Sequence, residues 1–435
     1  MSTMSTASTT QWLYALKNHG SKFGVERMAL FAGALGNPER AFPSILVAGS
    51  NGKGSTAAML EAIYRAGGLR TGLYTSPHLV RLGERVQIDR ISLSDALISA
   101  YVEELAVVAR GIADQDPEDS PSFFEFMTAM AFLEFNRRRV DVGIVEVGLG
   151  GRLDATNILS PAASVVTSIS LEHTNLLGDT LEKIAAEKGG IIKVGVPVVL
   201  GLLPDAAEQV LRKIARERNA PVFSVRERFN VGEKVYPETN LAGAHQRANA
   251  ALALLVVEVL RGQFPVDDAV ARAALRKTEW AARWQTFTLS RSRQLIVDAA
   301  HNAEGAAAIE PLLEKLTPAP TIITGALGKE RAEPLIATLA RHARALVFVH
   351  IGQERACSFE ELASCVPQGF RGTISCTSVE ELFPALGECA VGEDGGAVVV
   401  VGSVYLAGEV LTQFLYGEKS GEPFLQDSLP VSRAF

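Results

Sequence analysis

The chain has 435 residues, which exceeds what one hydrophobic core usually supports, so two or three domains are expected. Its formal net charge of −7 and its pI near 5.7 argue against a nucleic-acid or membrane-surface role. No uninterrupted apolar stretch reaches the roughly 20 residues that a membrane-spanning helix needs. The four cysteines lie between Cys357 and Cys389 without a Cys-x-x-Cys pair, which favours buried thiols in a reducing cytosol over a zinc site or a disulfide framework.

The first ten residues are rich in serine and threonine and lack the apolar segment of a signal peptide. We therefore expect residues 1–10 to form a disordered tail and the protein to be cytoplasmic.

Strand-like and helical stretches then alternate, which predicts α/β layering around parallel sheets. In the first half, strands are expected near 44–48, 72–75, 140–147, 163–169 and 197–202, and helices near 55–66, 127–138, 180–188 and 245–260.

The pattern restarts with strands near 294–299, 321–324, 345–351, 372–376 and 397–401, each followed by a helical stretch. The expected domains are 11–283 and 293–435, joined by a linker at 284–292. Trp280 and Trp284 are expected to pack at this junction, where the cleft between two α/β domains is a common place for a ligand.

The most informative segment is the apolar run Ile45–Ala48 and the turn Gly49-Ser50-Asn51-Gly52-Lys53-Gly54-Ser55-Thr56 that follows it. Its spacing differs from the common G-x-x-x-x-G-K-[ST] loop, and a glycine turn alone can be a tight strand–helix connection. Lys53 between two glycines favours a phosphate site, because backbone N–H groups at a helix N-terminus and a lysine together bind a polyphosphate.

Glu146 and His173 follow two of the expected strands. The carboxyl ends of parallel strands meet at one edge of a sheet, where ligands bind, so both residues are expected near the phosphate loop. The Glu146 carboxylate suits Mg²⁺, which prefers oxygen ligands. Histidine is a less usual Mg²⁺ ligand, so His173 fits a hydrogen-bonding or helix-entry role equally well.

Lys188, Asp298 and His301 each allow two interpretations. Lys188 ends the helix expected at 180–188, and its charge matches the negative end of that helix dipole. Asp298 and His301 follow the first strand of the second series. A carboxylate and an imidazole three residues apart suggest a ligand site, but a capping aspartate explains the same pattern.

The chain resembles the folylpolyglutamate synthase and dihydrofolate synthase branch of the Mur ligase superfamily. The resemblance rests on motifs that occur in order along almost the whole sequence. They are Phe23–Met28, Leu35–Pro38, Val47–Ser55, Tyr74–Leu79, Phe124–Thr128, Val145–Asn157, Glu172-His173-Thr174, Leu177–Thr180, Ile184–Lys193, Gly243–Gln246, Asp298–Asn302 and Val401–Glu409.

The resemblance implies an N-terminal P-loop ATPase-like domain with a mostly parallel sheet and a smaller C-terminal Rossmann-like α/β domain. It also implies an ATP-dependent amide ligase. ATP phosphorylates a carboxylate of a pterin substrate, and the α-amine of L-glutamate attacks the acyl phosphate and releases phosphate. Catalysis of this kind relies on positioning and charge neutralisation.

Family roles are carried over by position. Lys53, Glu146, His173 and Lys188 are the implied catalytic residues, with Lys188 as a carbamate, which reverses its reading as a helix-end cation. Two Mg²⁺ ions are expected at Ser76, Glu146 and His173. The implied substrate residues are Phe124, Arg152, Asp154 and Ser403. The implied ATP-binding residues are Gly49, Ser50, Asn51, Gly52, Lys53, Gly54, Ser55, Thr56, Gln246, Asn249, Arg283, Asp298 and His301.

Several positions depart from the family pattern. The largest departure is Gly328-Lys329-Glu330, where relatives carry Asp-Lys-Asp, so the contacts of the second domain are open at this point. The smaller departures are Ser50, Glu172, Gly189, Ala299 and Ala303.

Two other functions are weighed. A cell-wall amino-acid ligase for UDP-linked substrates is disfavoured, because it would carry a separate UDP-binding domain before the phosphate loop. A nucleotide-binding module without ligase activity is disfavoured by the intact Lys53, Glu146, His173 and Lys188. The expected partners are ATP, L-glutamate and dihydropteroate or a reduced folate, with no nucleic acid, no membrane and a monomeric state. The choice between dihydropteroate and folate stays open.

Overall fold

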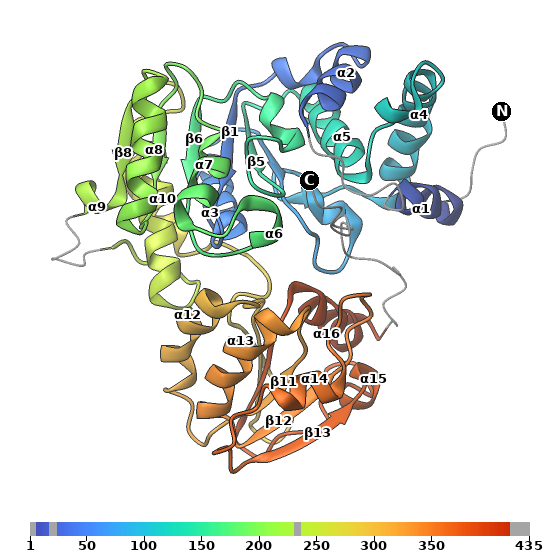
Figure 1. The fold of residues 1–435 in the computed structure, drawn as a ribbon, viewed down its shortest axis with the longest axis vertical. Coiled ribbons are helices and arrows are strands. Elements are labelled where there is room, and N and C mark those ends of the chain that lie inside the picture. The colour runs from blue at the N-terminus through green and yellow to red at the C-terminus, as the bar shows by residue number, and fades with distance from the viewer. Residues whose placement is uncertain (1–5, 17–23, 230–235, 418–435) are drawn as a thin grey trace.

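The computed structural model describes residues 6–16, 24–229 and 236–417, and these form two α/β bodies built on separate sheets (Figure 1). The larger body carries β1 to β8 and the smaller one β9 to β14. In the view of Figure 1 the smaller body lies below the larger one, with α12 and α16 on the side that faces it. No helix in the described ranges is long and apolar enough to cross a bilayer.

The first sheet has eight strands in the order β4-β3-β2-β5-β1-β6-β7-β8. The pairs from β2 to β8 are parallel, and β3 and β4 extend the edge in antiparallel pairing. Its strands are β1 Ser44–Ala48, β2 Thr71–Tyr74, β3 Val86–Ile88, β4 Ile91–Ser92, β5 Val142–Glu146, β6 Ala163–Val166, β7 Val198–Leu200 and β8 Val222–Ser224.

Helices cover both faces of this sheet and produce two separate cores. This is why β1 and β5 read as continuous apolar runs and are buried along their whole length. The helices are α1 Thr6–Ala15, α2 Glu26–Ala34, α3 Lys53–Ala66, α4 Asp95–Ala113, α5 Phe123–Arg138, α6 Thr174–Leu177, α7 Leu181–Gly189, α8 Asp205–Glu217, α9 Val225–Arg228, α10 Ala244–Val259 and α11 Asp268–Leu275. Short 3₁₀ turns occupy Pro38–Arg40, Leu82–Arg85, Pro117–Asp119 and Ala155–Ile158.

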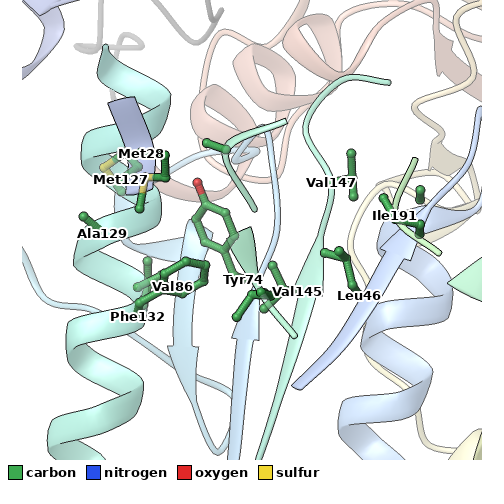
Figure 2. Close-up of a cluster of buried hydrophobic side chains, with 14 of the residues drawn as sticks. Met28, Leu46, Tyr74, Val86, Met127, Ala129, Phe132, Val145, Val147 and Ile191 are labelled. Carbon is green, nitrogen blue, oxygen red and sulfur yellow. The ribbon is translucent and has the colours of Figure 1, made fainter. Parts of the chain in front are cut away.

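Figure 2 shows the core between this sheet and α5. Tyr74, Val145 and Leu46 lie in register on three neighbouring strands, and the Tyr74 hydroxyl is 3.0 Å from Thr128 Oγ1 on α5. Phe132 packs in the same cluster. Each fully buried side chain of this kind stabilises the fold by ~1.5–3 kcal/mol. This packing holds the carboxyl ends of β1, β2 and β5 at one level, where the site lies.

The second sheet has six strands in the order β13-β12-β11-β14-β10-β9, parallel except for the β10–β9 pair. Its strands are β9 Gln285–Thr288, β10 Gln294–Val297, β11 Thr321–Thr324, β12 Ala345–Val349, β13 Thr373–Thr377 and β14 Ala397–Val401. Its helices are α12 Ala303–Leu313, α13 Lys329–His342, α14 Phe359–Ser364, α15 Val379–Leu382 and α16 Val404–Tyr416.

Both bodies have the expected α/β class, but two local expectations are wrong. Residues 6–10, expected in a disordered tail, belong to α1, whose Leu13 is fully buried, while residues 1–5 lie outside the described ranges. The expected linker 284–292 contains β9, which pairs with β10 through backbone hydrogen bonds. Its alternating half-buried and exposed residues give the weak signal typical of an edge strand.

Candidate active site

The phosphate loop, Glu146, Ser76 and His173 all lie beyond the carboxyl ends of neighbouring strands of the first sheet. The loop follows β1, Glu146 ends β5, Ser76 follows β2, and His173 follows β6. The parallel order β2-β5-β1-β6 therefore brings residues far apart in sequence to one edge, as the sequence predicts.

The phosphate loop needs glycine at two positions. Gly49 has φ +149° and approaches β6 so closely that a Cβ would lie 1.9 Å from Thr167 Oγ1. Gly52 has φ +84°, and a Cβ there would lie 2.6 Å from Asn249 Oδ1. Both positions lack room for a side chain and adopt backbone conformations that favour glycine. This tight turn ends at the first residue of α3, so the N-terminus of a 14-residue helix points at the loop.

Lys53 has its Nζ 2.8 Å from Gly49 O and 3.1 Å from Ser50 O. It forms no direct salt bridge within the described ranges, but its charge interacts with the nearby Glu146 and Glu172 carboxylates. Ser55 and Thr56 follow in the first turn of α3 and are buried. Their hydroxyl oxygens have no hydrogen-bond partner among the described residues. An ammonium without a direct ion pair and two unsatisfied hydroxyls match a phosphate–cation ligand.

Glu146 is 5% exposed, and Oε2 accepts a hydrogen bond of 3.1 Å from the Ser76 backbone N–H. Burial raises the pKa of its carboxyl, while the Lys53 charge opposes that rise. A cation bound beside the phosphate loop would stabilise the ionised form of this buried carboxylate.

Glu172 and Lys188 form an ion pair below the phosphate loop. Lys188 Nζ lies 2.8 Å from Glu172 Oε1 and 3.0 Å from Gly49 O, and both side chains are nearly inaccessible to solvent. Burial lowers the pKa of Lys188, and Glu172 opposes the fall. Burial alone would raise the pKa of Glu172, but Lys188 and Lys53 outweigh it and lower the pKa to about 2. Lys188 does lie in the last turn of α7, and its amine is turned into the site and away from solvent.

His173 occupies the N-cap position of α6 with φ +46°, a left-handed conformation that is uncommon for a non-glycine residue. Burial lowers its pKa to about 4, and Arg331, Lys53 and Lys188 act in the same direction against Glu172. The imidazole is therefore neutral near pH 7 and has a lone pair to offer to a cation.

The lowered pKa of His173 predicts a pH dependence of stability. In the unfolded state His173 takes up a proton below its ordinary pKa of 6.5, whereas in the folded state it does so only below about pH 4. The contribution of neutral His173 to the free energy of unfolding is therefore complete above pH 6.5 and is lost as the pH falls from 6.5 to 4. We expect His173→Asn to reduce this acid loss, measured by urea unfolding at pH 7 and pH 5 without divalent cations. An identical loss in the wild type and the variant would contradict the assignment.

Asp298 and Arg283 join the second body to the cleft. The Asp298 carboxylate accepts hydrogen bonds of 2.8 Å from the backbone N–H groups of Trp284 and Ala300, so it holds the junction against the end of β10. Burial raises the pKa of Asp298, and Arg283 opposes that rise. His301 follows in the same turn, where its Nδ1 lies 3.0 Å from Ala299 O and burial lowers its pKa.

Contacts also cross directly between the two bodies. Asn302, the N-cap of α12, donates from Nδ2 to Asn51 Oδ1 at 3.2 Å, and Asn51 Nδ2 donates to Glu304. Trp280 lies on the other side of the loop, and a Cβ on Gly54 would meet its ring at 2.9 Å. Trp280 thus packs at the junction as expected and also covers the phosphate loop.

A cavity of about 780 Å³ lies between the bodies. Sequence-predicted residues that line it include Ser50 to Gly54, Ser76, Phe124, Glu146, Asp154, His173, Arg283, His301 and Ser403. Lys188 and Gly49 line a smaller adjoining cavity of about 20 Å³ with Glu172. The cavity is of the size that small-molecule sites have.

Other predicted residues lie behind or beside the lining. Asn249 donates to Gln246 Oε1 at 3.1 Å and lies against Gly52, so this pair contacts the loop from outside the cavity. Arg152 is absent from the lining, and its half-exposed guanidinium pairs with Glu187 at 2.9 Å. Asp154 caps the turn Ala155–Ile158 and Ser403 caps α16, so both also have structural partners.

Sequence reasoning missed Arg331 and Arg355, which line the cavity from the second body. Each follows the carboxyl end of a strand, β11 and β12 respectively, and this position is the signal that could have found them.

Residues 47–257 match the model of the Mur ligase middle domain. Together with the phosphate loop and the second α/β body, this match defines the class of protein as a ligase of the Mur type.

Comparisons with individual proteins narrow the class. The chain is 31% identical to folylpolyglutamate synthase of Lacticaseibacillus casei over 96% of this chain and 100% of that protein. It is 36% identical to dihydrofolate synthase/folylpolyglutamate synthase of Bacillus subtilis over 70% of this chain and 74% of that protein. The structure of Escherichia coli FolC in complex with DHPP and ADP matches with a TM-score of 0.79 and 29% identity, over 93% of this chain and 96% of that one. The chain belongs to the folylpolyglutamate synthase/dihydrofolate synthase family of ligases.

Proposed function

We propose that the protein joins L-glutamate to dihydropteroate, to a reduced folate, or to both, at the expense of ATP. The observation that carries this proposal is the meeting of Lys53, Glu146, His173 and the Glu172–Lys188 pair at one sheet edge, facing a cavity closed by a second body. The E. coli relative that was solved with DHPP and ADP supports both a pterin substrate and a nucleotide.

The phosphates of ATP bind at the backbone N–H groups of Gly49 to Ser55, with Lys53 on the transferred phosphoryl group. That group passes to the substrate carboxylate, giving ADP and an acyl phosphate. The α-amine of L-glutamate then attacks the acyl carbon, and phosphate leaves as the amide forms. Asn51, Asn302 and Asp298 hold the two bodies together over the reacting atoms, which excludes water from the acyl phosphate.

The donor set at the sheet edge fits Mg²⁺. The buried Glu146 carboxylate, the Ser76 side chain, the unsatisfied Ser55 hydroxyl and a neutral His173 offer mostly oxygen ligands beside the phosphate loop. We assign Ser76, Glu146 and His173 to the two ions that the family resemblance implies. When bound, such ions neutralise the charge on the transferred phosphoryl group.

Lys188 meets the conditions for a carbamate. Burial lowers its pKa and so favours the neutral amine, which is the form that adds to carbon dioxide. The cavity of about 20 Å³ next to it gives room for a small group. The product is an anionic oxygen ligand directed at the phosphate region, consistent with a catalytic role for Lys188.

Phe124 and Asp154 line an apolar part of the cavity together with Leu149, Leu153 and Ala155. We assign this apolar part to the pterin substrate. A monomeric state and a cytoplasmic location complete the proposal.

The proposal is tested by phosphate release from purified protein with MgATP and L-glutamate, with 7,8-dihydropteroate or tetrahydrofolate as the second substrate. Release with dihydropteroate alone defines a dihydrofolate synthase, release with tetrahydrofolate alone defines a polyglutamylating enzyme, and release with both defines a bifunctional one. If neither substrate supports phosphate release by folded protein that binds ATP, the folate function is refuted and another amino-acid ligase of the superfamily is favoured.

A further inference from the structure

We propose that Arg90 is a positioning residue for the nucleotide, whose guanidinium holds the Trp280 ring against the phosphate loop; this rests on the ATP-dependent function proposed above. Arg90 lies in the larger body, at the turn between β3 and β4. Both residues line the cavity. Neither lies in the motifs that carry the family resemblance.

Arg90 has a backbone conformation that arginine seldom adopts. Ile88 pairs with Ile91, so Asp89 and Arg90 form a two-residue turn, with φ +49° and +72° respectively. Such a turn favours Asn-Gly or Asp-Gly. Asp89 fits it, because its carboxylate accepts a hydrogen bond of 2.8 Å from the Thr71 backbone N–H. Arginine at the glycine position strains the backbone, which indicates that its side chain makes a contact of functional value.

The Arg90 side chain makes two contacts with the segment that carries Trp280. Its guanidinium carbon lies 5.0 Å from the centre of the Trp280 ring, and Nη2 donates a hydrogen bond to the carbonyl oxygen of Glu279. Nη1 is buried and has no hydrogen-bond partner among the described residues, so hydrogen bonding alone does not explain where the charge lies. Burial lowers the pKa of Arg90, and the charges of Glu61 and Glu279 oppose the fall. A desolvated cation interacts more strongly with an aromatic face than an exposed one does.

Trp280 connects this contact to the phosphate loop. A Cβ on Gly54 would lie 2.9 Å from Cζ2 of the Trp280 ring, so the ring lies directly against the loop backbone. Gly54 is in the first turn of α3 and precedes Ser55, whose buried hydroxyl has no partner among the described residues. The ring therefore supports the loop at the end of the helix where the phosphates are expected. A loop that is already ordered loses less conformational entropy when the nucleotide binds.

The contacts from Arg90 through Trp280 to Gly54 predict an effect on nucleotide binding and not on the chemical step. The ring supports loop backbone that binds phosphate in the ground state and in the transition state alike. Loss of such uniform binding raises KM for MgATP and leaves kcat unchanged.

The test measures MgADP binding to the full-length protein by isothermal titration calorimetry, which needs no ligation. Arg90→Gly removes the guanidinium, and glycine adopts φ +72° without strain. We expect Kd for MgADP to rise by roughly 5- to 30-fold, the range of a partly to fully desolvated cation–π contact. The free energy of unfolding in urea should stay the same or rise. The matched control is Arg139→Gly at the exposed C-cap of α5, which has φ +50° and is absent from the cavity lining; it should leave Kd unchanged.

A double-mutant cycle separates action through Trp280 from direct contact with the nucleotide. In a Trp280→Leu background, Arg90→Gly should have no further effect on Kd for MgADP. Additive losses would overturn the positioning role, and so would an unchanged Kd in the single variant Arg90→Gly. A lower free energy of unfolding in that variant would assign Arg90 to fold stability and would overturn the proposal as well. Wild-type protein that binds MgADP without glutamate-dependent phosphate release refutes the ligase function alone, so the two failures are distinguishable.

Discussion

Lys53→Ala is expected to lower kcat/KM for ligation by roughly 10³-fold, near the upper end of what one preorganised charged donor contributes to a transition state. The Lys53 ammonium is held 2.8 Å and 3.1 Å from two loop carbonyls, so it is preorganised at the position where the phosphoryl group transfers. Alanine removes the charge and leaves the loop backbone in place. Phosphate release under substrate-saturating conditions measures the loss.

The matched control for this prediction is Lys213→Ala, which removes an exposed ammonium from α8 of the same body. It should retain the wild-type rate. A Lys53→Ala enzyme whose kcat/KM is within about tenfold of the wild-type value would contradict the role of Lys53 in phosphoryl transfer.

Lys188→Ala is expected to abolish measurable turnover and also to destabilise the fold. The substitution leaves Glu172 buried without its 2.8 Å partner, and removing one member of a buried pair costs about 3–5 kcal/mol. Adding Glu172→Ala should recover part of the stability but none of the activity, since the catalytic group is still missing. Urea unfolding and phosphate release measure the two effects separately.

Lys183→Ala is the matched control on the same helix, where Lys183 forms an exposed pair with Asp179. It should leave both stability and turnover near wild-type values. The carbamate adds a further expectation: wild-type activity should fall in carbon-dioxide-depleted buffer and return with bicarbonate. If wild-type activity does not respond to bicarbonate, Lys188 acts as an ammonium group and not as a carbamate.

The sequence predicts the site best where chemistry is tied to strand ends. Gly49 to Ser55, Glu146 and His173 each follow a short apolar strand, and parallel strands place such positions at one edge whatever their separation in sequence. The α/β class follows from the same alternation of strands and helices.

The structural features that the sequence does not predict depend on long-range packing. β9 is an edge strand whose residues show little apolar pattern, and its existence depends on pairing with β10. Arg152 lies in a strong motif, but in the structure it pairs with Glu187 on a neighbouring helix. Arg331 and Arg355 follow β11 and β12 but lie outside every motif that carries the family resemblance. Local patterns carry no information on such contacts.

The most direct test of the account follows the oxygen atoms of the substrate carboxylate. We would label the carboxylate of 7,8-dihydropteroate or tetrahydrofolate, whichever supports turnover, with ¹⁸O and analyse the phosphate released with MgATP and L-glutamate by mass spectrometry. An acyl phosphate transfers one carboxylate oxygen to phosphate, so the account predicts phosphate that carries a single ¹⁸O in each turnover. Unlabelled phosphate formed together with the amide product would contradict the activated-carboxylate mechanism and the arrangement of the site derived from it.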